Sequence, residues 1–356
     1  MSKENEPFNT PGHDVPSEPH SDALQQSSKL PLVVVVIGMA GSGKTTMIKA
    51  LWKYFSQPRV LDDKDTEQDT ITEIQPAFKT YILNLDPAVT STPYPANIDI
   101  CDTIKYKEVM KQYKLGPNGA IMTCLNLFAT KFDQVHDVLS KRAPNLDIVL
   151  VDTPGQIEVF NWSASGSIIL DTLALSYPTV ILYVLDTARC QSPVTFMSNM
   201  MYSCGVMYKS KLPFIMAFNK IDVQPATQCL EWMRNYNSFA SDVCKEDSYM
   251  ATLSRTCALS MNEFYEGIQS VSLSAGTSLG LEKLEITLQK ARNEYTNIYL
   301  PWLRDQRDVV RKRREKLAAE SAKHFAQDRE RDTKHKERQD GNDLVDKRVL
   351  RWKFSR

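Results

Sequence analysis

An uninterrupted apolar run that ends in a glycine-rich loop constrains the fold of this chain more than any other feature. Residues 31–37 read Pro-Leu-Val-Val-Val-Val-Ile, and such a short β-branched run predicts a strand buried on both faces. Residues 38–45 follow as Gly-Met-Ala-Gly-Ser-Gly-Lys-Thr, and residues 45–55 have helical periodicity. A strand, a G-x-x-x-x-G-K-T loop and a helix in this order predict a phosphate-binding loop, since a chance glycine turn would lack these flanks.

The loop offers several kinds of phosphate contact. Its glycines allow backbone N–H groups to face a phosphate chain, and the following helix directs its positive end at the same anion. We expect Lys44 to reach the β- and γ-phosphates and the Thr45 hydroxyl to bind Mg²⁺. The residues predicted to contact the nucleotide here are Gly41, Ser42, Gly43, Lys44, Thr45 and Thr46.

Further apolar runs alternate with segments of helical periodicity. This alternation predicts an α/β P-loop NTPase with a mainly parallel sheet flanked by helices on both faces. The other expected strands are 80–85, 146–151, 179–185, 213–218 and a weaker one at 271–273, and the expected helices are 102–113, 119–140 and 279–299.

Asp152 begins the sequence Asp-Thr-Pro-Gly-Gln directly after the strand at 146–151. The carboxyl ends of parallel strands form the edge at which such sheets bind ligands. We therefore expect Asp152 to hold Mg²⁺, directly or through water. Gly155 is expected to offer its N–H to the γ-phosphate and to move when that phosphate leaves. Without a phosphate loop, the same sequence would indicate only a turn.

Asn219-Lys220-Ile221-Asp222 follows the strand at 213–218 and predicts the choice of base. A carboxylate at Asp222 can accept hydrogen bonds from the N1–H and 2-amino groups of guanine, a donor pair that adenine lacks. Lys220 can lie over the base plane, and Asn219 can tie this loop to the phosphate loop. The backbone N–H groups of Ser274 and Ala275 are expected near the guanine oxygen. The pattern favours GTP over ATP.

Two further motifs are ambiguous on local grounds. Asp86, in Asn-Leu-Asp-Pro-Ala, ends the second strand, where its carboxylate can orient the attacking water, hold the metal shell or merely cap a turn. Residues 116–119, Gly-Pro-Asn-Gly, lie between two predicted helices. Their local chemistry favours a tight structural turn, because proline fixes φ and Asn and Gly tolerate positive φ.

These motifs together resemble those of the GPN-loop GTPase family, most closely its eukaryotic GPN-loop GTPase 1 type. The resemblance extends over about residues 31–302 and includes the phrase Pro-Val-Thr-Phe-Met-Ser-Asn-Met at 193–200. It implies a dimeric GTPase of the class of signal-recognition and nitrogenase iron proteins, with Asn118 beside the partner's γ-phosphate. Asp86 would then position the hydrolytic water, and Gln156 would assist. An acidic insert at 57–75 departs from the shorter connection expected in the family.

The resemblance also implies a cellular role. Eukaryotic proteins of this type act in the assembly and nuclear import of RNA polymerase II. The expected partners are a paralogous GPN-loop GTPase or a second copy of the chain, polymerase subunits and assembly chaperones. The expected location is the cytoplasm, with shuttling to the nucleus.

The sequence divides into a tail, a GTPase domain and a second tail. Residues 1–29 are polar and rich in Ser and Pro, which predicts disorder and no signal peptide. The domain is predicted at 30–302, with a mobile loop in the insert at 57–75 and extra helices in a variable insertion at 228–267. Residues 303–356 are predicted to be a charged tail, helical or disordered.

Composition narrows the remaining possibilities. The chain has 43 Lys and Arg and 43 Asp and Glu, and the C-terminal tail mixes both signs with few aromatic residues. We therefore expect no direct nucleic-acid binding. No apolar run approaches the ~20 residues of a membrane span, so a soluble protein without a membrane partner is expected. Seven scattered cysteines indicate reduced core thiols in a cytosolic or nuclear protein.

Two other functions stay open on the sequence. One is a nucleotide-locked scaffold with negligible hydrolysis, and the other is a P-loop phosphotransferase that acts on a small acceptor. The intact motif at 219–222 argues against the phosphotransferase.

Overall fold

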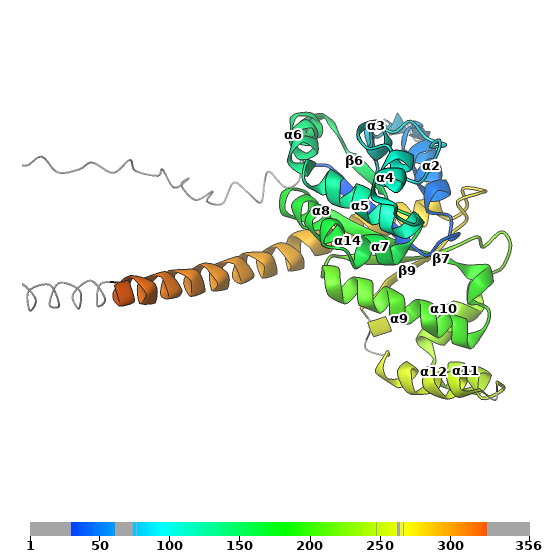
Figure 1. Ribbon diagram of the computed structural model, residues 1–356. Helices are drawn as coiled ribbons and strands as arrows, with labels where there is room; N and C mark the ends of the chain where they lie inside the picture. Colours follow the sequence, from blue (N-terminus) through cyan, green and yellow to red (C-terminus); the bar gives the residue numbers. More distant parts are fainter. Residues whose placement is uncertain are drawn as a thin grey trace, which may run out of the picture. The chain divides into compact units, whose positions relative to one another are not determined.

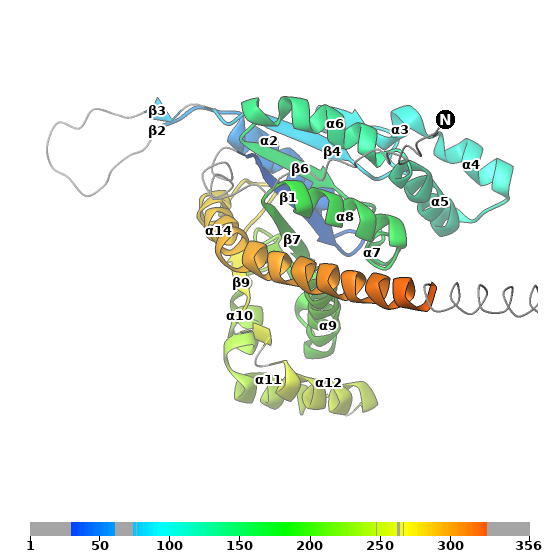
Figure 2. The ribbon, with the colours of Figure 1, turned by 90° about the vertical axis from the view of Figure 1, so that its left-hand side faces the viewer.

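A parallel sheet of seven strands organises the described part of the chain, in the order β5-β4-β6-β1-β7-β8-β9 (Figure 1). Every pairing within it is parallel. Figure 2 shows β1 between β6 and β7. The strands are β1 (Leu32–Gly38), β4 (Thr80–Asn84), β5 (Ile98–Asp99), β6 (Ile148–Asp152), β7 (Thr179–Asp186), β8 (Phe214–Asn219) and β9 (Gln269–Ser272). The predicted fold class is confirmed.

The computed structural model describes residues 30–60, 74–75, 77–246, 248–261, 264–265 and 267–325. These residues form two units that divide after Asn297. The predicted tail at 1–29 lies outside the described residues, as do 61–73 within the acidic insert and 326–356 at the other end.

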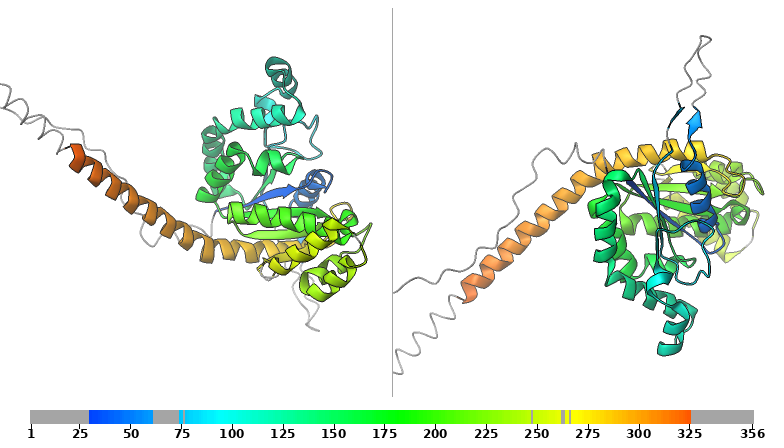
Figure 3. Two further views of the ribbon diagram at one scale, coloured as in Figure 1. Left: turned by 60° about the horizontal axis from the view of Figure 1, so that its bottom comes forward. Right: turned by 90° about the horizontal axis from the view of Figure 1, so that it is seen from above.

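The central strands are buried on both faces because helices cover both sides of the sheet. All residues of β1, β6, β7 and β8 are buried. On one face, α2 (Lys44–Phe55) and α14 (Leu281–Glu294) enclose alternate strand residues such as Val34 and Leu182. Figure 3 shows the sheet between α2 and the layer of α5 (Pro117–Ala129) and α8 (Ala164–Ser176).

The remaining helices connect the strands and extend the fold. The segment after β6 forms α7 (Ile157–Asn161), and α9 (Pro193–Ser210) follows η3 (Thr187–Cys190). The variable insertion forms the expected extra helices. These are α10 (Thr227–Arg234), α11 (Tyr236–Val243) and α12 (Tyr249–Ser260).

Three predicted helices have different limits from those expected. The helix expected at 102–113 is two, α3 (Ile100–Thr103) and α4 (Tyr106–Tyr113), because Ile104 and Lys105 are extended. The helix expected at 119–140 is α5 and α6 (Phe132–Arg142), which leads into η2 (Ala143–Asn145). The last predicted helix is α14, followed by the π-helical turn η4 (Tyr295–Tyr299).

The insert at 57–75 is not wholly a loop. Its ends pair as a short antiparallel ladder, β2 (Arg59–Val60) with β3 (Ile74–Gln75). The residues between these strands lie outside the described part of the chain.

The second unit is described over residues 298–325, of which 300–325 are helical. Most of its side chains are exposed, and Arg311 pairs with Asp308 and Glu315 at 3.1 and 4.0 Å. Among the described residues of both units, no helix is both long enough and apolar enough to cross a bilayer.

Candidate nucleotide-binding site

The loop at 38–45 turns sharply between the end of β1 and the start of α2. Gly41 and Gly43 have φ angles of 82° and 95°, in the left-handed region that favours glycine. A Cβ at Gly43 would also lie 2.6 Å from Nδ2 of Asn219. Position 43 therefore requires glycine, both because of the positive φ in the turn and because the loop that begins at Asn219 approaches it closely.

Lys44 lies buried at the centre of this site. Its Nζ donates to the carbonyl oxygens of Gly38 at 2.9 Å, Met39 at 3.2 Å and Gly155 at 3.3 Å. Burial lowers the pKa of Lys44, while the nearby Asp152 and Asp86 carboxylates act in the opposite direction. The ammonium group thus links the phosphate loop to the segment that follows β6.

Asp152 ends β6 with one oxygen bonded and the other free. Its Oδ2 accepts a 2.7 Å hydrogen bond from the Tyr94 hydroxyl, whereas its buried Oδ1 has no hydrogen-bond partner among the described residues. Burial raises the pKa of Asp152 to about 6, against the hydrogen bonds from Tyr94 and Thr45. An unpaired carboxylate oxygen near a Thr hydroxyl fits a Mg²⁺ site.

A magnesium ion here would need ligands from outside the protein. Within the described residues, no group of three or more His, Cys, Asp or Glu side chains is placed to hold a metal. Mg²⁺ bound with a nucleotide typically takes one or two protein ligands and completes its octahedron with phosphate oxygens and water. Thr45 and Asp152 suit that arrangement.

Asp86 lies beside the Gly155 peptide. Its Oδ2 accepts a hydrogen bond from the Gly155 N–H at 3.2 Å, and its Oδ1 accepts one from the Ala88 N–H at 3.0 Å. Burial raises the pKa of Asp86, and these two amides counteract the shift. Lys44 and Asp86 therefore contact the two backbone polar groups of Gly155, Lys44 its carbonyl and Asp86 its N–H.

Gln156 adjoins this peptide as the N-cap of α7. Its Oε1 is buried, and no residue in the described part of the chain forms a hydrogen bond with it. Buried acceptors are normally paired, so this oxygen is available to a water molecule or a substrate group.

Asn219 joins three loops at the end of β8. Its Nδ2 donates to the Ser42 carbonyl at 2.9 Å, which is the tie to the phosphate loop that the sequence suggested. Its Oδ1 accepts hydrogen bonds from the N–H groups of Lys220 at 2.8 Å and Ala275 at 2.9 Å. The Ala275 amide is thus engaged with Asn219, and its role at a guanine oxygen stays a prediction.

Asp222 and Ser274 form the outer part of this region. The Ser274 hydroxyl donates to Asp222 Oδ1 at 2.5 Å, and Ser274 is fully buried. Asp222 itself is exposed. A buried hydroxyl therefore orients an accessible carboxylate, and the role of that carboxylate in base recognition stays a prediction.

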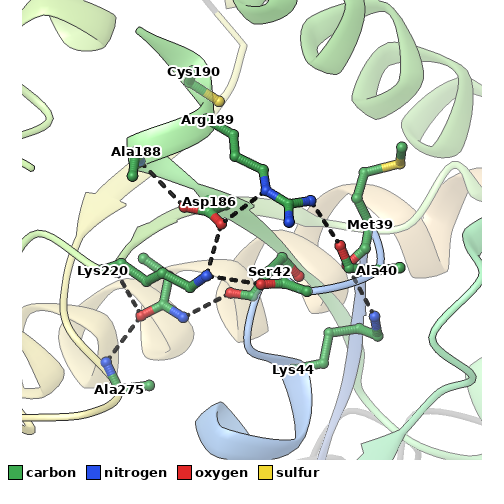
Figure 4. Close-up of polar contacts among 12 residues, drawn as sticks. Met39, Ala40, Ser42, Lys44, Asp186, Ala188, Arg189, Cys190, Lys220 and Ala275 are labelled. Atoms are coloured by element: carbon green, nitrogen blue, oxygen red, sulfur yellow. Dashed lines mark hydrogen bonds and ion pairs between the residues drawn. The ribbon is translucent and has the colours of Figure 1, made fainter. Parts of the chain in front are cut away.

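Three residues that the sequence motifs did not identify complete the site. Tyr94 donates a hydrogen bond to Asp152. Figure 4 shows the other two: Asp186 at the end of β7 pairs with Lys220, and Arg189 donates to the Ala40 carbonyl at 3.4 Å. Asp186 follows a buried strand, so the rule that strand ends carry ligands could have identified it. No comparable signal marks Tyr94 or Arg189.

Asn118 stands apart from the other predicted catalytic residues. Gly116 is the N-cap of α5, Pro117 occupies the first helical position that suits proline, and Asn118 follows, exposed. The tight turn expected at 116–119 is the first turn of α5, and a neighbouring side chain contacts it through the 3.4 Å hydrogen bond from the Tyr106 hydroxyl to the Pro117 carbonyl. The fold gathers Lys44, Asp86, Asp152 and Gln156 but leaves Asn118 on the surface.

Comparison with known proteins relates the chain to one family model and to several proteins named GPN-loop GTPases. A family model described as a conserved hypothetical ATP binding protein matches residues 64–294. The chain is 50% identical over 264 residues to GPN-loop GTPase QQT2 of Arabidopsis thaliana, which covers 74% of this chain and 65% of that protein. It is 45% identical over 302 residues to GPN-loop GTPase 1 of Schizosaccharomyces pombe, covering 82% and 77% respectively.

A solved structure has the same architecture. PAB0955, a GTPase in apo form from Pyrococcus abyssi, superposes with a TM-score of 0.59 at 25% identity. The match covers 73% of this chain and 97% of that one.

Proposed function

The chain belongs to the GPN-loop GTPase family, and on that basis we propose a dimeric switch that hydrolyses GTP and acts in RNA polymerase II assembly and nuclear import. The observation that carries the GTP assignment is the link between base and phosphate sites. Asn219 binds both the phosphate loop and the loop at 274–275, while Ser274 orients the Asp222 carboxylate. We therefore propose that the site binds a guanine nucleotide, although the matching family model is described as an ATP binding protein.

Hydrolysis would draw on the residues around Gly155. Lys44 is placed to offset charge that develops on the phosphoryl oxygens, because its Nζ already reaches the phosphate loop and the Gly155 carbonyl. When bound at Thr45 and Asp152, Mg²⁺ would supply further neutralisation of the same charge. Asp86 accepts from the Gly155 N–H, and Gln156 follows Gly155 in the chain, so we propose that these two side chains orient the water molecule.

The switch would operate through the Gly155 N–H. This N–H donates to Asp86, and a γ-phosphate would compete for it. Binding and loss of that phosphate would therefore change what holds the segment leading into α7. Lys44 would exchange its carbonyl partners for phosphate oxygens at the same time.

Dimer formation is proposed from the exposure of Asn118. Its side chain lies on the surface at the start of α5, so it is available to a neighbouring subunit. A second copy or a paralogous family member would then place Asn118 at the other subunit's nucleotide. Sedimentation of the chain with GDP and with a non-hydrolysable GTP analogue tests this proposal.

The polymerase role rests on the similarity to relatives named GPN-loop GTPase 1. We propose polymerase subunits and assembly chaperones as partners, and a cytoplasmic protein that shuttles to the nucleus. Co-purification of polymerase subunits with the wild-type chain but not with Lys44→Ala would support this role. Equal recovery with both chains would contradict a nucleotide-dependent function.

Replacement of the base-recognition carboxylate gives the sharpest test of guanine binding. Asp222→Asn places an amide donor where guanine needs an acceptor, so GDP should bind at least about tenfold more weakly. Xanthine has a carbonyl in place of the 2-amino group, so the same variant should bind XDP better than GDP. A wild-type chain that does not prefer GDP to ADP would refute the assignment.

Single-turnover phosphate release separates the proposed GTPase from the two alternatives. Wild type should release phosphate from GTP, whereas Asp86→Ala and Gln156→Ala should retain GTP binding and release phosphate more slowly. Equally negligible release from all three would favour a scaffold. A phosphorylated acceptor in place of free phosphate would favour a phosphotransferase.

A further inference from the structure

Asp186 holds two cations on the outer side of the phosphate loop (Figure 4). Its Oδ2 lies 2.7 Å from Lys220 Nζ and 3.6 Å from Arg189 Nε. Its Oδ1 accepts a 3.2 Å hydrogen bond from the Ala188 N–H, which fixes the orientation of the carboxylate at the start of η3. The side chain is 9% exposed, so salt screens its closer ion pair only partly.

The two cations also contact consecutive carbonyl groups of the phosphate loop. Lys220 Nζ donates to the Gly41 carbonyl at 2.8 Å, and Arg189 donates to the Ala40 carbonyl at 3.4 Å. A loop that directs its N–H groups at a phosphate directs some of its carbonyl groups away from it. Donors on the outward carbonyls therefore fix the peptides whose orientation the phosphate site depends on.

Lys220 needs external support to stay in this position. Its backbone has a φ of 66°, a left-handed conformation that is costly for a residue other than glycine. The Asn219 side chain accepts from its N–H, and Asp186 and Gly41 bind its Nζ. Asp186 is the charged partner in this set, and it comes from a different strand, β7.

We infer that Asp186 is a positioning residue for nucleotide binding. It holds Lys220 on the Gly41 carbonyl and so couples the loop at 219–222 to the phosphate loop. The inference rests on the proposed guanine-nucleotide site. Arg189 is a second and weaker link between Asp186 and the phosphate loop, because its ion pair with Asp186 is longer and its side chain is 69% exposed. A carboxylate that acted only by its charge would repel the phosphates, and its removal would strengthen binding.

A double-mutant cycle on GDP affinity separates positioning from plain charge. The four proteins are the unchanged full chain, Asp186→Asn, Lys220→Met and the combination. Asp186→Asn should raise the Kd for GDP about tenfold when Lys220 is present and less than about twofold beside Lys220→Met. An equal change in both backgrounds, or tighter binding by Asp186→Asn, would overturn the inference.

Further variants exclude a purely structural effect. Asp186→Ser retains an oxygen that can accept from the Ala188 N–H but has no charge, so it should weaken GDP binding as Asp186→Asn does. Wild-type affinity in Asp186→Ser would refute the role of the charge. Arg189→Gln should raise the Kd by only about twofold to threefold, consistent with an exposed ion pair. Asp308→Asn removes the same charge from the helix at 300–325 and should leave GDP binding unchanged.

The experiment also distinguishes this inference from the proposed function. If the unchanged chain binds no GDP, the guanine-nucleotide assignment itself fails. If it binds GDP and the cycle is additive, the assignment stands and only the role of Asp186 is lost.

Discussion

The Tyr94 hydroxyl donates a 2.7 Å hydrogen bond to Oδ2 of Asp152 in the protein interior. Tyr94 is 4% exposed, and burial together with the Asp152 charge raises the pKa of its hydroxyl far above the ordinary value. The hydroxyl therefore stays protonated and donates to the carboxylate. This bond joins the segment between β4 and β5 to the carboxylate proposed for magnesium. It leaves Oδ1 as the one oxygen of Asp152 without a hydrogen-bond partner.

Tyr94→Phe should weaken magnesium binding without removing a magnesium ligand. The carboxylate would lose a hydrogen bond to a charged group, worth about 1.5–3 kcal/mol, and with it a fixed orientation. We expect the Mg²⁺ concentration that half-maximally slows GDP release to rise at least about tenfold. Stopped-flow release of a fluorescent GDP, measured over a Mg²⁺ titration, gives this value.

Tyr183→Phe is the matched control for this change. Tyr183 is fully buried in β7, but its hydroxyl has no hydrogen-bond partner within the part of the chain that the structure describes. Its removal should leave the Mg²⁺ dependence unchanged. Equal behaviour of the two variants would show that the Tyr94 bond does not position Asp152.

Gly43→Ala should abolish tight nucleotide binding. The new Cβ would lie 2.6 Å from Asn219 Nδ2, and the φ of 95° is strained for any residue with a Cβ. The phosphate loop or the loop at 219–222 must then move, which separates the Asn219 side chain from the Ser42 carbonyl. Calorimetric titration with GDP should show at least about a hundredfold loss of affinity if relief of the clash costs about 3 kcal/mol.

Gly267→Ala controls for the change of residue type. A Cβ at that position would lie 3.9 Å from the Phe264 carbonyl oxygen, an ordinary van der Waals contact, and the described residues beyond its chain neighbours come no closer. It should bind GDP like the wild type. Undiminished binding by Gly43→Ala would contradict the close approach that the structure gives.

The parallel sheet could be predicted because buried parallel strands have continuous apolar sequences. The runs at 32–38, 148–152 and 179–186 consist almost entirely of aliphatic residues and are bounded by Gly, Pro or Asp. The two-residue β5 is too short to produce such a pattern. The break between α5 and α6 at Thr130 and Lys131 contains neither Gly nor Pro, so helical periodicity alone does not reveal it.

The same distinction holds for the site: residues in short motifs could be predicted from the sequence, whereas residues that only the fold brings to the site could not. Lys44, Asp152 and Asn219 lie in motifs whose spacing is set within a few residues, so each could be identified from its own stretch of sequence. Asn219 makes the contact with the phosphate loop that its motif suggested. Tyr94 and Arg189 reach the site only because the chain folds back over long sequence separations. A hydrogen bond between residues 58 positions apart leaves no local pattern in one sequence.

Ser274→Ala should reduce the discrimination between guanine and adenine nucleotides. The Ser274 hydroxyl donates a short, charge-assisted hydrogen bond to Asp222, and without it the exposed carboxylate can turn away from the base. The ratio of the Kd for ADP to the Kd for GDP should fall about tenfold, mainly because GDP binds more weakly.

Competition against a fluorescent GDP measures both constants for this comparison. Ser140→Ala, which removes an exposed hydroxyl bonded within α6 to the Asp137 carbonyl, should keep the wild-type ratio. A ratio that stays constant in Ser274→Ala would mean that Asp222 is oriented by other groups.

Ser163→Ala should destabilise the fold at the junction of α7 and α8, the two helices that follow β6. The Ser163 hydroxyl caps α8 by accepting from the Gly166 N–H at 3.0 Å, and it also donates to the Phe160 carbonyl at 3.0 Å. Loss of an N-cap costs about 1 kcal/mol, and here the unpaired groups would be buried, so the loss should reach about 2 kcal/mol. Urea unfolding of the nucleotide-free chain should show a lower midpoint with an unchanged slope.

Ser167→Ala is the matched control, one turn along the same helix. It removes a hydroxyl that donates to the Ser163 carbonyl at 3.2 Å, and it should shift the midpoint far less. If both variants unfold at the same urea concentration, the cap does not hold this junction together.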